Sequence, residues 1–170
     1  LLTSIQADIT TKRILKSNMN IDYTVLPQDV NYADQILKNS VIYGRLRANS
    51  FIYDYDTKLE DHDITGIGGS VIIKTAPFHG FSGTVGFYTS QVPFNRMEES
   101  EVAIAKAGKD LFSRDNVRDG KSWGISIIGQ AYLEAKRGKT VAKVGRQLVH
   151  TVFTKSNDTK MIPNTFDGVT

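Results

Sequence analysis

Long runs of alternating apolar and polar residues dominate the chain and restrict its fold more than any other feature. Residues 41–55, 64–75, 81–90 and 123–136 keep a period of two, and residues 140–148 form a shorter run. A period of two is typical of a β-strand, because successive side chains of a strand point to opposite faces of the sheet. The sequence therefore predicts an all-β protein whose strands each have one apolar and one polar face.

The length of these runs separates two kinds of β protein. Strands of globular proteins average ~5–6 residues, whereas a tilted strand that crosses a bilayer needs ~9–11 residues. The first four runs reach the longer value, and no apolar stretch approaches the ~18 residues of a membrane-spanning helix. A chain without such helices crosses a membrane only as strands closed into a barrel. The run lengths thus favour an antiparallel transmembrane β-barrel.

The connections between the runs alternate in length, which is a second sign of a barrel. Residues 76–80 and 137–139 are short turns, whereas residues 54–63, 91–121 and 154–163 are long and polar. Bacterial barrels have short periplasmic turns, long extracellular loops and aromatic girdles at both interfaces. Aromatic residues flank the predicted long loops at Phe51, Tyr53, Tyr55, Phe87, Tyr88 and Trp123, and the short turns at Phe78, Phe81 and Tyr132.

The composition of the 170 residues excludes several classes of protein. The chain has no cysteine, so disulfide scaffolds, thiolate metal sites and cysteine nucleophiles are excluded. The net charge of +3 comes from scattered Lys and Arg, which predicts no nucleic-acid partner. The histidines show no metal-ligand spacing, and His62, between Asp61 and Asp63, is interpreted as a hydrated loop tip rather than a weak cation site. We therefore predict neither metal, cofactor nor enzymatic activity.

The chain is predicted to have two parts, with residues 40–170 forming the strands. Residues 1–39 are a polar segment with one short helix near 31–38, and residues 1–7 are either the tail of a signal peptide or a disordered terminus. A further helical turn is expected within 98–109. Because a new strand starts near Phe166, the chain is expected to hold only the first several strands of a longer protein.

Two segments of the sequence resemble one known family. Residues 163–168 read Pro-Asn-Thr-Phe-Asp-Gly after a strand with a Val-Gly pair, and residues 43–47 read Tyr-Gly-Arg-Leu-Arg. Both are similar to segments of the OprD-type outer-membrane porins, in the style of ε-proteobacteria, and the resemblance extends over about residues 34–170. It implies the bacterial outer membrane, a homotrimer, and a barrel of roughly 16–18 strands with an aqueous lumen. It also implies a constriction loop at about 154–166 that folds into the pore.

In such a barrel the polar face of each strand lines the pore. The predicted pore-lining residues are Arg45, Arg47, Asn49, Lys74, Gln130, Tyr132, Glu134, Lys136 and Lys143. The predicted residues of the constriction loop are Asp158, Lys160, Pro163, Asn164, Thr165 and Phe166. In the run 123–136, Ile125, Ile127, Ala131 and Leu133 are expected to share the lipid face.

Fixed cations on a pore wall lower the electrostatic cost of moving an anion through a narrow water column. Arginine also binds carboxylates through paired hydrogen bonds. The sequence thus predicts a porin for small polar solutes, anionic or zwitterionic, such as carboxylates and amino acids. Alternatively, these cationic residues are solvated wall residues without a role in solute selection. Residues 154–166 could likewise form an exposed surface loop instead of a constriction.

The same sequence pattern also allows a second fold. In a soluble or surface-exposed all-β binding or adhesion domain, the apolar rows would form the core of a sandwich, and Arg45 and Arg47 would lie on its solvated face. Such a domain stays folded in water without detergent, whereas part of a membrane barrel does not.

Overall fold

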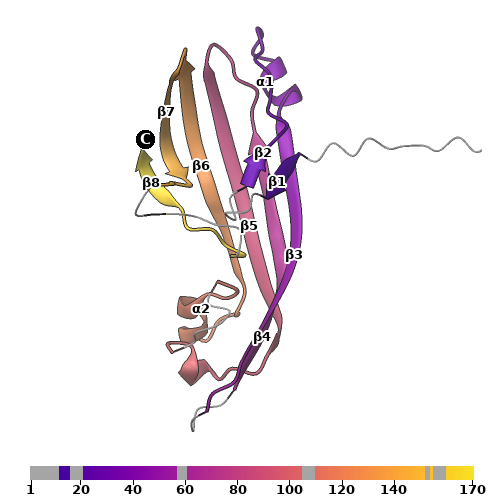
Figure 1. Ribbon diagram of the computed structural model, residues 1–170, viewed down its shortest axis with the longest axis vertical. Helices are drawn as coiled ribbons and strands as arrows, with labels where there is room; N and C mark the ends of the chain where they lie inside the picture. The colour runs from indigo at the N-terminus through magenta and orange to yellow at the C-terminus, as the bar shows by residue number, and fades with distance from the viewer. Residues whose placement is uncertain (1–11, 16–20, 57–60, 105–109, 152–153, 155–159) are drawn as a thin grey trace, which may run out of the picture.

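The computed structural model describes residues 12–15, 21–56, 61–104, 110–151, 154 and 160–170. Its centre is one antiparallel sheet of six strands arranged in sequence order (Figure 1). These strands are β3 (Val41–Tyr53), β4 (His62–Lys74), β5 (Phe81–Asn95), β6 (Ile125–Arg137), β7 (Thr140–Gln147) and β8 (Phe166–Val169). A separate hairpin pairs β1 (Arg13–Leu15) with β2 (Ile21–Tyr23).

The described helices are short and lie outside the sheet. They are α1 (Gln35–Lys38), the 3-10 turn η1 (Glu99–Glu101) and α2 (Arg114–Arg118). The side chain of Ser113 caps α2 by accepting a hydrogen bond from the backbone N–H of Asn116. No helix in the described part of the chain is long and apolar enough to span a membrane.

The predicted all-β, antiparallel fold is confirmed, and each of the five alternating runs contains a strand. The turns at 75–80 and 138–139 lie at one end of the sheet, and at the other end β3, β5 and β7 stop and β4, β6 and β8 start. The short helix expected near 31–38 is α1, and the turn expected within 98–109 is η1. The hairpin β1–β2 and helix α2 were not predicted.

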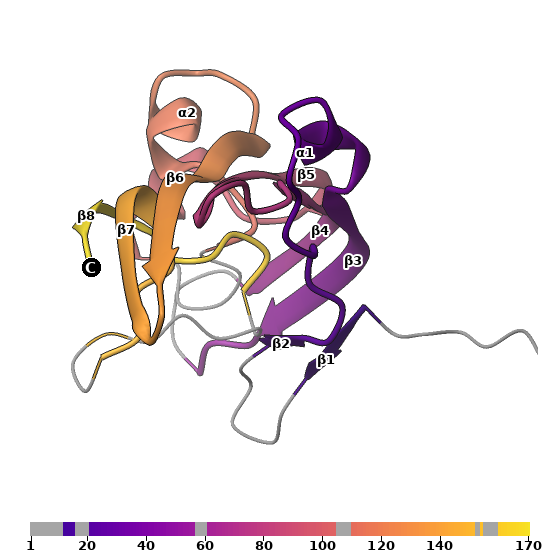
Figure 2. The same ribbon diagram turned by 90° about the horizontal axis from the view of Figure 1, so that it is seen from above.

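The described residues do not close into a barrel. Within them, β3 and β8 each pair with one neighbour, so they are the two edges of an open sheet. Seen from above, the six strands form an arc with the β1–β2 hairpin near its open side (Figure 2). We call the face of the sheet turned toward that hairpin the concave face, and the opposite one the convex face.

The two faces differ in what covers them. On the convex face large apolar side chains are exposed: Ile42, Leu46, Ile52, Ile67, Val71, Ile73, Phe81, Val85, Phe87, Phe94, Ile128, Leu133, Val144 and Val169. Much of the concave face of β3 to β6 is covered by other parts of the same chain. The buried apolar residues therefore lie between the concave face and the segments that pack on it, and none of the convex rows contributes to them.

Two clusters fill the concave side. At the end with the long connections, Ile64 of β4 packs against a set of residues from the 96–124 connection and from residue 161. This set is Met97, Val102, Leu111, Phe112, Val117 and Met161. Further along the face, Tyr43, Ile72 and Tyr88 form a second cluster, on which Tyr23 and Ile162 pack. Burial of these side chains attaches both the long connection and the N-terminal hairpin to the sheet.

A β-bulge in β6 corrects the predicted phase of that strand. Phe87 pairs with Ile128 and Gly86 pairs with Gln130, so Gly129 is an extra residue. The bulge moves Ile125 and Ile127 to the concave face, where Ile127 packs on the second cluster. The prediction that these two isoleucines share a face with Ala131 and Leu133 was therefore wrong.

Candidate functional site

A cationic pocket lies on the concave face of β3 and β4. Its cavity is about 160 Å³ in volume. Arg45 and Arg47 line it together because they stand two residues apart on β3 and so point to the same face. The facing positions on β4 are Ser70, which pairs with Arg45, and Gly68, which pairs with Arg47. The small residues of β4 leave room above the sheet beside the two guanidinium groups.

The other walls of this pocket come from distant parts of the sequence. Arg13 comes from β1, His150 follows β7, and Lys160 precedes β8. No acidic residue is among the described residues that line the pocket. A concave site lined by positive charges alone concentrates anions from solution. The rings of Tyr23 and Tyr88 supply part of its surface, so the pocket combines cationic groups with aromatic walls.

The segment 160–163 folds inward onto the sheet. The Nη1 atom of Arg47 donates to the carbonyl of Lys160 at 2.7 Å, and the backbone N–H of Met161 donates to Oδ2 of Asp110 at 2.7 Å. Met161 is buried and Pro163 lines the cationic pocket. The segment therefore contacts the wall on one side and the long 96–124 connection on the other.

The remaining residues of the predicted constriction loop are placed differently. Lys160 Nζ lies 3.4 Å from Oδ1 of Asn164, which is exposed, and Thr165 is half-buried. Phe166 is the first residue of β8, so the predicted loop of 154–166 runs into a strand. Asp158 lies outside the described residues.

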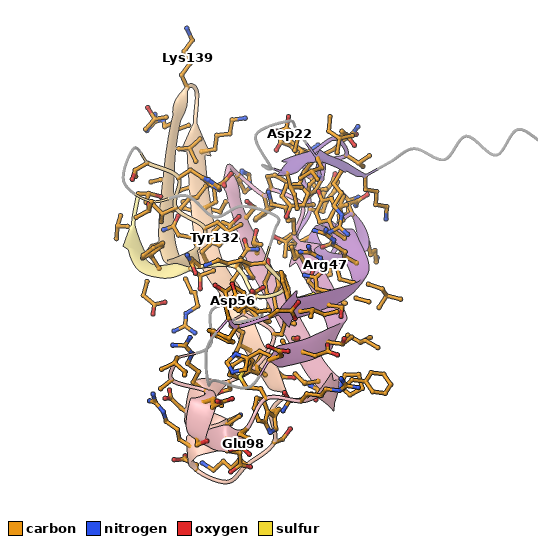
Figure 3. The ribbon with its side chains drawn as sticks, turned by 60° about the horizontal axis from the view of Figure 1, so that its bottom comes forward. Asp22, Arg47, Asp56, Glu98, Tyr132 and Lys139 are labelled. Atoms are coloured by element: carbon orange, nitrogen blue, oxygen red, sulfur yellow. The ribbon has the colours of Figure 1, made fainter. Side chains whose placement is uncertain are left out.

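A second group of predicted residues lies toward the short turns. Lys74, Glu134 and Lys136 line a larger cavity of about 560 Å³. Lys143 Nζ lies 3.3 Å from Oε2 of Glu134 and 5.4 Å from the ring centroid of Tyr132. Figure 3 shows Tyr132 of β6 and Arg47 of β3 among the side chains that fill the concave side. This end of the face carries both signs of charge, unlike the cationic pocket.

The last two predicted residues, Gln130 and Asn49, lie on the same face. Gln130 is buried, and its Nε2 donates to the hydroxyl of Tyr88. Asn49 is half-buried between Arg47 and Phe51 on β3. The structure thus places the nine residues predicted as pore-lining on one face of one sheet. The alternating register of the strands explains this common orientation.

Several residues of the site were missed by sequence reasoning. Arg13 and Tyr23 belong to strands of three residues, which are too short to show a period. His150 lies in an irregular segment and carries no local signal. Tyr88, which the sequence predicts for an aromatic girdle, is instead buried in the second cluster.

The interpretation of His62 as a hydrated loop tip was wrong. His62 is the first residue of β4, is fully buried, and lies with its Nε2 2.9 Å from Oε2 of Glu101. Within the described part of the chain, no group of three or more His, Asp and Glu side chains is arranged to hold a metal ion.

Comparisons of the chain with protein-family models, with curated proteins and with solved structures found no match. The resemblance to OprD-type porins therefore depends on the two sequence segments alone.

Proposed function

We propose that the chain forms part of the wall of an outer-membrane porin, and that small anionic or zwitterionic solutes pass along its concave face. The observation that carries the proposal is the exposed apolar band of the convex face. Soluble proteins rarely expose apolar patches larger than a few hundred Å². A band that spans six neighbouring strands is the surface that hydrocarbon would cover in a membrane barrel.

The boundary of the band supports the same proposal. On β4 the convex apolar positions extend to Ile67, after which Thr65 is polar. Ile67 pairs with Gln91 on β5, where the continuous apolar row ends at Phe87 and only Phe94, opposite Thr65, is apolar beyond it. A boundary offset along the strands is expected where a flat apolar slab meets strands that tilt against its normal.

The boundary does not shift between β5 and β6, because Phe87 pairs with Ile128, the last apolar convex residue of β6 in this direction. It shifts again at β7, where the last apolar convex residue, Val144, pairs with Leu133 of β6. Polar side chains beyond the boundary bond to one another: Thr89 Oγ1 lies 2.8 Å from Ser126 Oγ. Groups near a bilayer interface are expected to pair in this way.

The concave face supplies the proposed path. Arg45, Arg47 and Lys160 line the cationic pocket, and Lys74 and Lys136 line the larger cavity toward the short turns. These cations lower the energy of an anion in both cavities. The nearby Glu134 favours solutes that also carry a positive group. This arrangement supports carboxylates and amino acids as the solute class.

The open edges require further strands. In a bilayer, the edge backbone groups of β3 and β8 that no neighbouring strand pairs would each cost several kcal/mol unless other groups bond to them, as Lys12 and Arg13 do at β3. The proposal therefore includes additional strands that pair with both edges and close the barrel. A homotrimer stays a prediction of the family resemblance.

The proposal is tested with the full-length protein isolated from a bacterial envelope. We expect it to require detergent for extraction, to change its gel mobility on heating, and to conduct ions in a planar bilayer. A protein that is folded and soluble in water without detergent, with no conductance, would contradict the proposal.

One observation favours the alternative of a soluble or surface-exposed binding domain. On the convex face, Arg146 Nη2 and Nε lie 2.9 and 3.0 Å from the two carboxylate oxygens of Asp167. Charged residues on a lipid-facing surface are destabilising, by ~2–4 kcal/mol for Arg at the bilayer midplane and ~0–1 near the interface. In the porin, this ion pair must therefore lie at the interface, in line with the offset boundary.

A further inference from the structure

The β1–β2 hairpin is attached to the edge of β3. The Nη2 atom of Arg13 donates to the carbonyl of Gly44 at 3.1 Å. This carbonyl points away from β4, because successive carbonyls of a strand alternate in direction and that of Arg45 faces Gly69 of β4. Lys12 donates in the same manner to the carbonyl of Ile42. A strand that closes a barrel at this edge would compete for both carbonyls.

The hairpin also contacts the concave face, where a closing strand would not compete. The ring of Tyr23 lies on the ring of Tyr43 with a centroid distance of 4.4 Å. The hydroxyl of Tyr43 donates to the carbonyl of Val25, just after β2. The ammonium group of Lys74 lies 5.4 Å from the centroid of the Tyr23 ring. These contacts fix Tyr23 over the sheet independently of the edge of β3.

Tyr23 stands between the two cavities of the concave face. It lines the cationic pocket of about 160 Å³, whereas Lys74, whose ammonium lies over its ring, lines the larger cavity of about 560 Å³. Burial raises the pKa of the Tyr23 phenol above its ordinary value. The phenol is therefore neutral at physiological pH, and a neutral ring stands between the cationic pocket and the larger cavity, whose lining carries both signs of charge.

We propose that Tyr23 forms a constriction of the solute path, and that the β1–β2 hairpin is a built-in size filter for small carboxylates. Arg13, on the same hairpin, adds a third guanidinium group to the pocket lined by Arg45 and Arg47. This inference depends on the proposed porin function and deepens it. It makes the N-terminal hairpin, besides the segment 160–163, a determinant of which solutes pass.

The test measures conductance of the full-length protein in planar bilayers bathed in potassium chloride or potassium gluconate, the bulkier anion. Tyr23→Ala should raise the ratio of gluconate to chloride conductance at least about twofold, because pore diameter controls passage. Tyr23→Trp should lower this ratio, and Tyr23→Phe, which keeps the ring, should leave it unchanged. Tyr32→Ala is the matched control, since Tyr32 is exposed and lines neither cavity.

The contribution of Arg13 is measured in the same bilayers. Arg13→Gln should reduce the preference for chloride over potassium, whereas Lys139→Gln, at the tip of the β6–β7 turn (Figure 3), should not. Equal chloride preference in the Arg13→Gln variant and the unmodified protein would overturn the role of Arg13.

The outcomes distinguish failure of the porin function from failure of the Tyr23 constriction. Absence of any conductance in the unmodified protein would contradict the porin function itself. Conductance that shifts with Arg45→Gln but is identical in Tyr23→Ala and Tyr23→Trp would overturn only the constriction. If Tyr23→Ala does not fold, the constriction is tested by comparing Tyr23→Trp with Tyr23→Phe. Equal ratios of gluconate to chloride conductance in these two variants would overturn the inference.

Discussion

The imidazole Nε2 of His62 and the carboxylate Oε2 of Glu101 lie 2.9 Å apart and join β4 to the 96–124 connection. His62 is fully buried, and the ring of Tyr55 meets its edge at a centroid distance of 5.0 Å. Its Nδ1 has no hydrogen-bond partner among the described residues. The contact with Glu101 is therefore the polar interaction that compensates for burial of this side chain, and it holds the long connection over the concave face.

Replacing Glu101 with Ala should weaken this attachment. The variant would leave the imidazole buried without its partner, which costs about 1–3 kcal/mol of the free energy of unfolding. Denaturant unfolding measures this loss, and hydrogen exchange should accelerate at the amides of 96–104. Glu99→Ala in the same turn is the control, because Glu99 is exposed. Equal stability of the two variants would show that the contact does not stabilise the connection.

The cationic pocket leads to a prediction about ion selectivity. Replacing both Arg45 and Arg47 with Gln removes two charges from the wall while keeping shorter polar side chains there. We expect single-channel conductance to persist and the reversal potential in a salt gradient to shift toward cation selectivity. Arg118→Gln on α2, outside both cavities, should leave the reversal potential unchanged. A double variant with unaltered selectivity would remove the electrostatic basis of the proposed path.

The strands were predictable because their alternation continues over ten or more residues, whereas the phase of β6 was not. A pattern with a period of two assumes that each residue has one partner across the ladder. Gly129 breaks this assumption, since it is inserted between Ile128 and Gln130 opposite Phe87 and Gly86. The apolar character of Ile125 and Ile127 fits either face, so the sequence alone does not reveal the change.

The bulge itself can be tested with a matched pair of glycines. A Cβ at Gly129 would meet the ring of Tyr88 at 2.7 Å, whereas a Cβ at Gly44 would meet nothing within 4 Å. Gly129→Ala should displace Tyr88 from the second cluster and lower the free energy of unfolding by about 1–3 kcal/mol. Gly44→Ala should change it by less than about 0.5 kcal/mol. Thermal unfolding compares the two, and an unchanged Gly129→Ala variant would mean that the ring adapts.

The residues of the candidate site were predictable only where their spacing in the sequence determines the face of the sheet to which they point. Arg45 and Arg47 share a face because they are two residues apart, and this follows from the sequence. The contact of Arg13 with the edge of β3 joins residues 31 positions apart, and nothing in the chain near Arg13 indicates it. His62 was misjudged because Asp61 and Asp63 suggest exposure, although alternation along β4 buries only the residue between them.

The convex face offers a test that separates the porin from the soluble domain. Leu46 is 94% exposed in the middle of β3 and lies within the apolar band. If this face contacts lipid, Leu46→Arg should cost about 2–4 kcal/mol at the bilayer midplane. If it contacts water, replacing an exposed leucine should change stability by less than about 0.5 kcal/mol. Denaturant unfolding from lipid vesicles measures the difference against Ile104→Arg, whose exposed side chain lies in the 96–124 connection. Equal effects of the two substitutions would favour the soluble domain, because only a lipid-facing surface distinguishes Leu46 from Ile104.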